Sequence, residues 1–252
     1  MDVLIFGGQS NMCGTTSIFP KDIFELDGAY EYKYNNNKVT PLKHPCGEDI
    51  NEDLLEAASS GCMIPDFVRA YRLMRNVKIM TVHVSKGRTR ICDWEKNSDR
   101  YEVAKEKILL AINEARKIEK VEHVYYIWLQ GESDATHSTS EQEYYSRLID
   151  YKNNLKKDTG VEKFGIIRVG HFSKQDECDQ AIQRAQEKCV KEDKDFLMLT
   201  RVCEFLSKDE FFMNPTHKGH YENNALAIIG NCAGEYLGRY AVNEIIKGEY
   251  ND

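Results

Sequence analysis

Short apolar runs alternate with amphipathic stretches along most of the chain. Five runs are nearly continuous in apolar character and rich in β-branched or aromatic residues, which is typical of strands covered on both faces. They are Asp2–Gly7, Lys78–Val84, His123–Leu129, Phe164–Val169 and Phe196–Val202. The intervening stretches with helical periodicity are Pro65–Met74, Asp99–Lys117, Ser140–Lys156, Asp176–Lys191 and Tyr221–Ile246. This alternation predicts an α/β fold with a parallel sheet and right-handed crossovers.

One region, Thr15–Ser60, departs from this alternation. It contains asparagines at Asn35–Asn37, prolines at Pro41 and Pro45, and no sustained period. We interpret it as a long ordered excursion on the connection after the first strand, and long loops of this kind are often functional. No repeat or linker marks a second domain, so we expect residues 1–252 to form a single domain.

Composition and charge narrow the classes of partner. The formal net charge is −7, which argues against nucleic acid as a partner because nucleic acid favours basic patches. No apolar run reaches the roughly 18 residues of a membrane span, so we expect no membrane partner. The apolar stretch near the start, Val3–Phe6, is too short for a signal peptide. We therefore expect a cytoplasmic protein, or a mature form whose leader has been removed.

The chain has eight cysteines, and no pair of them has CxxC spacing, which argues against a zinc ribbon or a redox motif. They are Cys13, Cys46, Cys62, Cys92, Cys178, Cys189, Cys203 and Cys232. An even number of cysteines is compatible with disulfides. In a chain of this length without a leader, free thiols are the favoured interpretation.

Polar segments follow three of the predicted strands, where the carboxyl ends of a parallel sheet bind ligands. The first is Gly7–Met12, in which Ser10 stands close to two glycines and is a candidate nucleophile. Gly8 permits a tight turn, and an N–H within the turn can face a developing oxyanion. The alternative is that Ser10 only caps a helix.

The second and third segments offer candidate oxyanion donors and acids. In Lys86–Trp94, the N–H of Gly87 or Arg88 is a candidate oxyanion donor, unless the segment is an ordinary turn. In Trp128–Ala135, the side-chain amide of Gln130 is another candidate donor. Glu132 and Asp134 either orient neighbouring groups or cap the next helix. Such polar groups are costly to cluster at one strand end without a role.

A fourth segment, Asn214–Tyr221, lies just before the last predicted helix and contains two histidines. A serine hydroxyl needs a nearby base to take its proton, and histidine suits that role because its pKa lies near neutrality. We therefore predict that His217 or His220 is the base, although either could be a surface histidine at a helix start.

These four segments, in this order, resemble the SGNH-hydrolase superfamily, and more closely its sialate O-acetylesterase and acetylxylan esterase branch, carbohydrate esterase family six. The first block, GQSNM, is intact as Gly8–Met12 and includes Gln9. The third block, WxQGExD, is intact as Trp128–Asp134. The second, GGTSI in the family, is degenerate here because Arg88 replaces the second glycine. In the fourth, the small residue and the glycine that follow the family's histidine fall on Ala225 and Gly230, which favours His220.

The resemblance implies a three-layer α/β/α sandwich, flavodoxin-like, with a five-stranded parallel sheet. It implies that Ser10 is the nucleophile and His220 the base, with Gln9, Gly87, Arg88, Gln130, Glu132 and Asp134 around the oxyanion or the substrate. The family's acid falls on His217, where no aspartate stands. The orienting group is then His217 itself or a carboxylate from Asp209, Glu210, Glu132 or Asp134. In the other register, His217 is the base and Asn214 stands three residues before it.

The resemblance also implies a function: hydrolysis of O-acetyl esters of sialic acid or xylan-type sugars, through an acyl-enzyme and without a metal or other cofactor. The expected partner is a small acetylated carbohydrate. Aromatic residues that could line a sugar site are Tyr30, Tyr32, Tyr34 and Trp94. The alternatives are a lipase- or thioesterase-like SGNH hydrolase, and a carbohydrate-binding protein that has lost catalysis.

Overall fold

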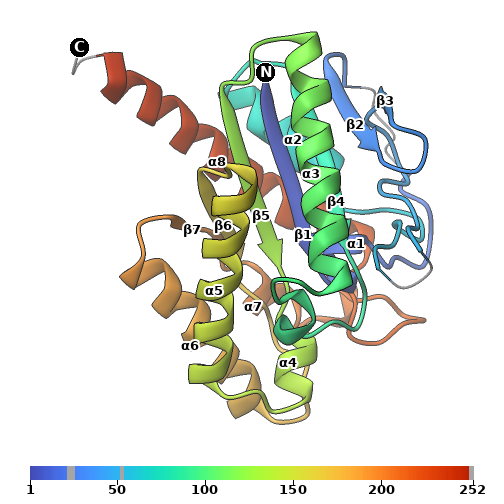
Figure 1. Cartoon of the computed structure of the whole chain (residues 1–252). Helices are drawn as coiled ribbons and strands as arrows, with labels where there is room; N and C mark the ends of the chain where they lie inside the picture. Colours follow the sequence, from blue (N-terminus) through green and yellow to red (C-terminus); the bar gives the residue numbers. More distant parts are fainter. Residues whose placement is uncertain (22–25, 52–53, 250–252) are drawn as a thin grey trace.

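Seven strands form one sheet, in the order β3-β2-β4-β1-β5-β6-β7, in a computed structural model that describes residues 1–21, 26–51 and 54–249 (Figure 1). The strands are β1 (Asp2–Gly8), β2 (Ala29–Lys33), β3 (Lys38–Pro41), β4 (Ile79–Ser85), β5 (His123–Leu129), β6 (Lys163–Ile167) and β7 (Phe196–Thr200). Neighbouring strands run parallel, apart from β3, which is antiparallel to β2. The predicted α/β fold with a parallel-dominated sheet is thus confirmed.

The predicted count of five strands is wrong, because β2 and β3 lie inside the Thr15–Ser60 excursion. The run Asn35–Asn37, which we interpreted as part of an irregular loop, belongs to the turn that joins these two strands. Asn37 adopts φ 49° there, a left-handed conformation that asparagine tolerates better than most residues. Both strands are short and lie at the edge of the sheet, so their side chains carry little of the apolar pattern that marks a central strand.

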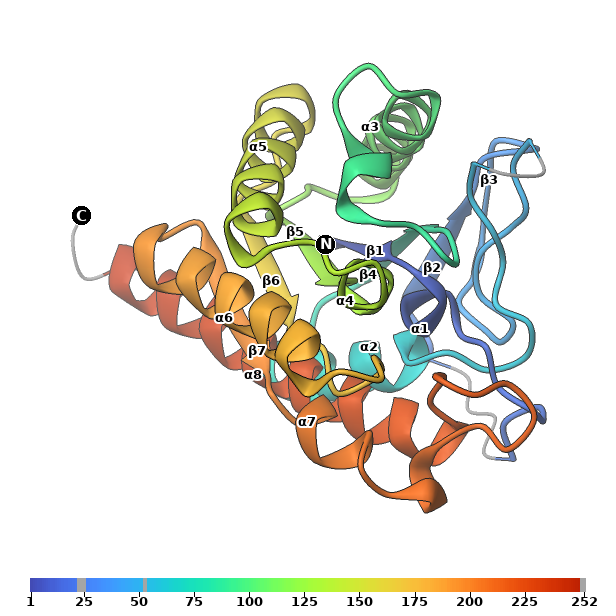
Figure 2. The same ribbon diagram turned by 90° about the horizontal axis from the view of Figure 1, so that it is seen from below.

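Helices cover both faces of the sheet (Figure 2). One face packs on α2 (Ile64–Met74) and α8 (Asn223–Glu249), and the other on α3 (Asp99–Ile118) and α5 (Glu141–Thr159), with α6 (Asp176–Glu192) beside α5. Short helices are α1 (Ser10–Cys13), η1 (Ile91–Trp94), α4 (Glu132–Thr136), α7 (Cys203–Leu206) and η2 (Glu210–Phe212). Ser140 caps α5, because its hydroxyl accepts the N–H of Glu143 at 3.2 Å.

The contact between α2 and α8 is made through glycines. Gly230, Gly234 and Gly238 recur every four residues on α8 and face α2. A Cβ atom added at Gly230 would lie 2.6 Å from the carbonyl oxygen of Met63, and one at Gly234 would overlap the carbonyl of Phe67. The two helix backbones therefore approach one another more closely than any larger side chain would permit.

The excursion is tied to α3 by buried charges. The Lys107 ammonium, on α3 and 0% exposed, lies 2.9 Å from a carboxylate oxygen of Glu48. Glu31 on β2 accepts the N–H of Gly47 at 2.6 Å and pairs with Lys33 at 2.8 Å. Removing one partner from a buried pair leaves an uncompensated charge, so these contacts hold the excursion in one arrangement.

The sheet has its topological switch point at β1, which lies between β4 and β5. Chain connections leave in opposite directions on its two sides, so a crevice opens beyond its carboxyl end. Ser10 and α1 directly follow that end. Among the described residues, no helix combines the length and apolar character that a bilayer crossing requires.

Candidate active site

Ser10 is the first residue of α1, two residues after β1 ends. Gly8 adopts φ 149°, and a Cβ atom there would overlap the carbonyl of Leu129 on β5, so only glycine fits this turn. Ser10 is 8% exposed. Within the described residues, the Ser10 N–H has no hydrogen-bond acceptor, as expected at the first turn of a helix. This N–H is available to a ligand.

A cavity of about 330 Å³ opens at Ser10. Its walls come from the ends of β1, β4 and β5 and from the loops before α6 and α8. The lining residues are Gln9, Ser10, Arg88, Glu132, Ser133, Thr136, His137, Phe172, Lys218, Gly219 and His220. All four sequence blocks that carry the resemblance contribute lining residues, the second of them only Arg88. The cavity therefore unites segments that are far apart in the chain.

The structure separates the two histidines of the C-terminal block. His220 lines the cavity with Ser10, whereas His217 is exposed and lies outside the lining. The Nδ1 atom of His217 is 3.0 Å from the hydroxyl of Thr216. The structure therefore supports His220 over His217 as the candidate base. Within the described residues no hydrogen bond joins the Ser10 hydroxyl to His220, and such contacts often form only when substrate is bound.

The imidazole of His220 is oriented by the main chain. Its Nδ1 atom lies 3.1 Å from the carbonyl oxygen of His217. A carbonyl oxygen only accepts, so the contact requires the proton on Nδ1 and leaves Nε2 with a free lone pair. Burial lowers the pKa of His220 below its ordinary value, which keeps the ring neutral near pH 7. The residue at the family's acid position thus contributes its backbone carbonyl, not its side chain.

Asn214 holds the loop around His220 by hydrogen bonds to its backbone. The Asn214 side-chain oxygen accepts the N–H groups of Thr216 and His217, both at 2.9 Å, and the Asn214 N–H donates to the His220 carbonyl at 2.8 Å. Asn214 is therefore a loop-forming residue and not the partner of a His217 base. Asp209 and Glu210 are exposed and lie outside the cavity lining.

Asn11 connects the nucleophile helix to this loop. Its Oδ1 accepts the N–H of Tyr221 at 3.0 Å, and its Nδ2 donates to Glu132 Oε1 at 2.8 Å and to the Gly219 carbonyl at 3.3 Å. The backbone on both sides of His220 is thereby fixed to the residue after Ser10. Sequence reasoning did not single out Asn11, although it lies inside the GQSNM block.

Glu132 is a buried acid on the cavity wall, 5% exposed. Asn11 binds one carboxylate oxygen, whereas Oε2 is buried without a hydrogen-bond partner in the described part of the chain. Burial raises the pKa of Glu132 to about 7, despite the opposing hydrogen bond from Asn11. Glu132 is therefore partly protonated near neutral pH. Among the described residues, no hydrogen bond joins its carboxylate to His220 Nδ1.

The other residues of the third block support the site from beneath. Gln130 is 0% exposed, and its amide nitrogen donates to the Thr89 carbonyl at 2.9 Å and to Asp134 at 2.6 Å. Asp134 also accepts the N–H of Ile91 at 2.9 Å, and Gln9 accepts the N–H of Ser133 at 3.1 Å. Gln130 thus donates to internal partners in this structure, and its role as an oxyanion donor stays a prediction.

The second block also differs from expectation. The N–H of Gly87 donates to a carboxylate oxygen of Glu56 at 3.3 Å, so it is not free for an oxyanion. Gly87 still adjoins the nucleophile, because a Cβ there would lie 3.4 Å from Ser10 Cβ. Arg88 adopts φ 63°, a conformation that glycine would adopt without strain. Its side chain reaches the cavity wall.

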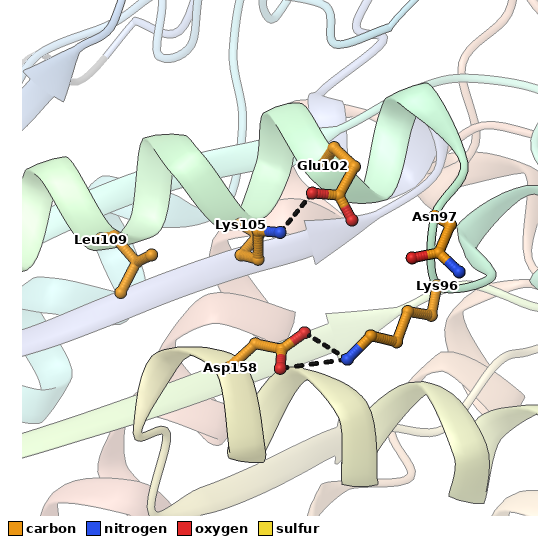
Figure 3. Close-up of a pocket in the computed structure, with 6 residues that line it drawn as sticks. All are labelled: Lys96, Asn97, Glu102, Lys105, Leu109 and Asp158. Atoms are coloured by element: carbon orange, nitrogen blue, oxygen red, sulfur yellow. Dashed lines mark hydrogen bonds and ion pairs between the residues drawn. The ribbon is translucent and has the colours of Figure 1, made fainter.

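A larger hollow elsewhere lacks this chemistry. It measures about 540 Å³, lies between α3 and α5 and is lined by Lys96, Asn97, Glu102, Lys105, Leu109 and Asp158 (Figure 3). Its charged groups pair with one another: Lys96 binds both Asp158 oxygens, at 3.1 and 2.8 Å, and Lys105 binds Glu102. It contains no serine and no imidazole, so the cavity at Ser10 is the candidate active site.

Comparison with known families gives a match over residues 1–224, to the family described as carbohydrate esterase, sialic acid-specific acetylesterase. The chain belongs to this family. The carbohydrate esterase is accordingly a hydrolase that acts on esters. A search of curated proteins finds no match.

Solved structures confirm the fold of the carbohydrate esterase. A protein from Arabidopsis thaliana superposes with a TM-score of 0.71 at 18% identity, covering 94% of this chain and 97% of the other. NanS gives a TM-score of 0.66 at 12% identity, with coverage of 95% and 97%. A catalytic mutant of Axe2, an acetylxylan esterase from Geobacillus stearothermophilus, gives 0.50 at 12%, with coverage of 92% and 91%.

Proposed function

We propose that this esterase removes O-acetyl groups from an acidic sugar of the sialic acid class, through an acyl-enzyme on Ser10. The observation that carries the proposal is the shared cavity of Ser10 and His220, in which the His217 carbonyl fixes the histidine tautomer that can act as a base. Family membership supports the ester as the bond that is cleaved.

The mechanism follows from these contacts. Ser10 Oγ attacks the acetyl carbonyl while His220 Nε2 takes its proton. The same imidazole then protonates the departing sugar oxygen. The sugar leaves with a free hydroxyl, and Ser10 remains acetylated. Water, deprotonated by His220, attacks this ester, and His220 returns the proton to Ser10 Oγ as acetate leaves. The His217 carbonyl accepts a hydrogen bond from His220 Nδ1–H throughout, so the ring keeps one orientation.

The oxyanion requires donors that are not already engaged. The Ser10 N–H meets this condition, and the Arg88 guanidinium on the cavity wall supplies a positive charge. Gly87 and Gln130 are left out because their N–H groups have internal acceptors. Each well-placed donor contributes roughly 3 kcal/mol to lowering the barrier.

The charges of the cavity favour an acidic sugar over a neutral one. Arg88 and Lys218 are cationic, and the only carboxylate that lines the cavity among the described residues, Glu132, has a pKa of about 7. A sialic acid carries a carboxylate that such cations bind, whereas an acetylated xylose does not. The limited cavity volume also disfavours the long acyl chains of a lipase substrate.

Replacing Arg88 or Lys218 with glutamine is expected to raise KM for an O-acetylated sialic acid by about 10-fold, because each variant loses one charge-assisted hydrogen bond to the substrate carboxylate. The rate with 4-nitrophenyl acetate, which has no carboxylate, should change by less than about 3-fold in Lys218→Gln. Initial rates of acetate release measure the first effect. The exposed Lys157→Gln variant is the control, and equal losses with both substrates would contradict carboxylate recognition.

Replacing His217 with alanine is expected to change kcat/KM by less than about 3-fold, because the backbone carbonyl that orients His220 remains. A loss of about 100-fold or more would instead assign a catalytic role to the His217 side chain. Steady-state hydrolysis of 4-nitrophenyl acetate measures the difference, with Thr216→Ala as the neighbouring control.

The direct test of function compares acetate release from O-acetylated sialic acid and from acetylated xylose. We expect kcat/KM to be at least about 10-fold higher for the sialic acid. A preference for xylose would move the substrate to the neutral class. No acetate from either sugar, with equal 4-nitrophenyl acetate rates for wild type and Ser10→Ala, would favour the binding-protein alternative.

All eight cysteines are free thiols in the structure. This fits the cytoplasmic location expected from the sequence, because reducing compartments keep thiols free. We retain that location as part of the proposal.

A further inference from the structure

A second group of reactive side chains lies outside the catalytic cavity. His44, Cys46 and Cys62 come from the two ends of the segment between β3 and α2, and the Nδ1 or Nε2 atom of the histidine and both Sγ atoms lie within 4.8 Å of one another. Cys46 is 0% exposed and Cys62 is 3% exposed. Two thiols and one imidazole at this spacing are a ligand set that zinc prefers.

We propose that His44, Cys46 and Cys62 bind one zinc ion, with a water molecule as the fourth ligand. His44 Nδ1 lies 4.0 Å from Cys62 Sγ. Tetrahedral zinc, with bonds of about 2.3 Å to sulfur and 2.0 Å to nitrogen, holds such atoms about 3.5 Å apart, so this pair would close by about half an ångström.

Cys62 stands two residues before α2 begins. Ile64 is the first residue of α2, and the positive end of a helix stabilises a thiolate. Zinc binding then displaces the remaining thiol protons, and two thiolates balance the two charges of the ion.

The fourth position has an opening to solvent. His44 and Cys62 both line a cavity of about 540 Å³, together with Glu222 and Arg69. This cavity has no lining residue in common with the cavity at Ser10. A zinc ion can therefore enter without passing the catalytic residues, and its water faces this second cavity.

Bound zinc would join the excursion to the nucleophile helix. His44 and Cys46 follow β3, whereas Cys62 packs on the turn after α1: a Cβ atom at Gly14 would lie 2.6 Å from Cys62 Cβ. The ion would thus close the long connection between β3 and α2 at the point where it meets α1. We expect its contribution to be mainly to stability.

The test uses the reduced full chain after treatment with a chelator. We expect one equivalent of Zn²⁺ to bind, to raise Tm by about 5 °C or more at saturation, and to release protons. Co²⁺ in its place should give the strong visible bands of a tetrahedral site and a thiolate-to-cobalt charge-transfer band. Cys62→Ser and Cys46→Ser should each weaken Zn²⁺ binding by at least about 100-fold and reduce the charge-transfer band.

Controls separate this site from other groups. Binding should be unchanged in Cys232→Ser, a thiol exposed on α8, and in His171→Gln, which belongs to another group of possible ligands with Asp176 and Asp179. If a cysteine variant fails to fold, His44→Gln and its cobalt spectrum provide the same test. Hydrolysis of 4-nitrophenyl acetate by each variant verifies folding separately.

Four results would overturn the proposal. The first three are the absence of one-to-one binding of Zn²⁺ or Co²⁺ by the reduced chain, binding that survives both cysteine substitutions, and loss of binding in His171→Gln alone. A Cys46–Cys62 disulfide that forms in air, with no metal binding after reduction, would also overturn it. None of these outcomes depends on the esterase proposal.

Discussion

Replacing Ser10 with alanine is expected to lower kcat/KM for acetyl ester hydrolysis by about 10⁴-fold or more, to a rate near that of the uncatalysed reaction with bound substrate. The physical reason is that Ser10 lines the cavity together with His220, and that its own N–H has no acceptor within the described part of the chain. Without the hydroxyl no acyl-enzyme forms, and only oxyanion stabilisation and substrate binding remain.

A double-mutant series strengthens this test. His220→Ala should cost nearly as much as Ser10→Ala, and the double variant should be little worse than either, because residues that act as a unit are not additive. Ser133→Ala is the matched control, since this second serine also lines the cavity. Rates and rapid-quench detection of acetyl-enzyme measure the series. Retention of more than a tenth of the activity in Ser10→Ala would refute the assignment of the nucleophile.

Replacing Glu132 with glutamine is expected to stabilise the protein at pH 8 by about 3 kcal/mol relative to wild type, and to have little effect at pH 4.5. The folded-state pKa of Glu132 is raised from 4.5 to about 7 by burial. As pH rises from 4.5 to 7, the unfolded chain releases this proton more readily than the folded one. The stability present below the unfolded pKa is therefore lost across this window, and a shift of this size corresponds to about 3 kcal/mol.

Urea unfolding of wild type and Glu132→Gln at several pH values measures this prediction. Glutamine retains an oxygen that can accept the Asn11 amide, so the variant removes the ionisation and keeps the contact. Glu210→Gln, at an exposed acid, is the control and should show no such pH dependence. A stability difference that stays constant from pH 4.5 to 8 would contradict a raised pKa for Glu132.

The sequence predicted the elements that form the interior of the fold. The central strands β1, β4 and β5 are buried on both faces, so their apolar runs were unmistakable. The strands β2 and β3 were missed because an edge hairpin needs no continuous apolar run, and its polar turn resembles a loop. The place of β2 in the sheet depends on its pairing with β4, which no local pattern records.

The sequence identified candidate residues of the site but not their contacts. It indicated Ser10 and favoured His220, but it could not reveal that a main-chain carbonyl lies beside the imidazole, because any residue at position 217 provides one. It also could not reveal two acceptors of the Gln130 and Gly87 N–H groups, the Thr89 carbonyl and the Glu56 carboxylate, because they lie in other segments. The meeting of Cys46 with Cys62 likewise depends on the fold and not on spacing.

The glycines of α8 have a consequence for the position of the base. Their close contact with the α2 backbone fixes the position of α8 against α2. His220 precedes the start of this helix at Asn223 by three residues. A bulkier residue at Gly230 or Gly234 is therefore expected to displace the imidazole and lower activity without touching the cavity.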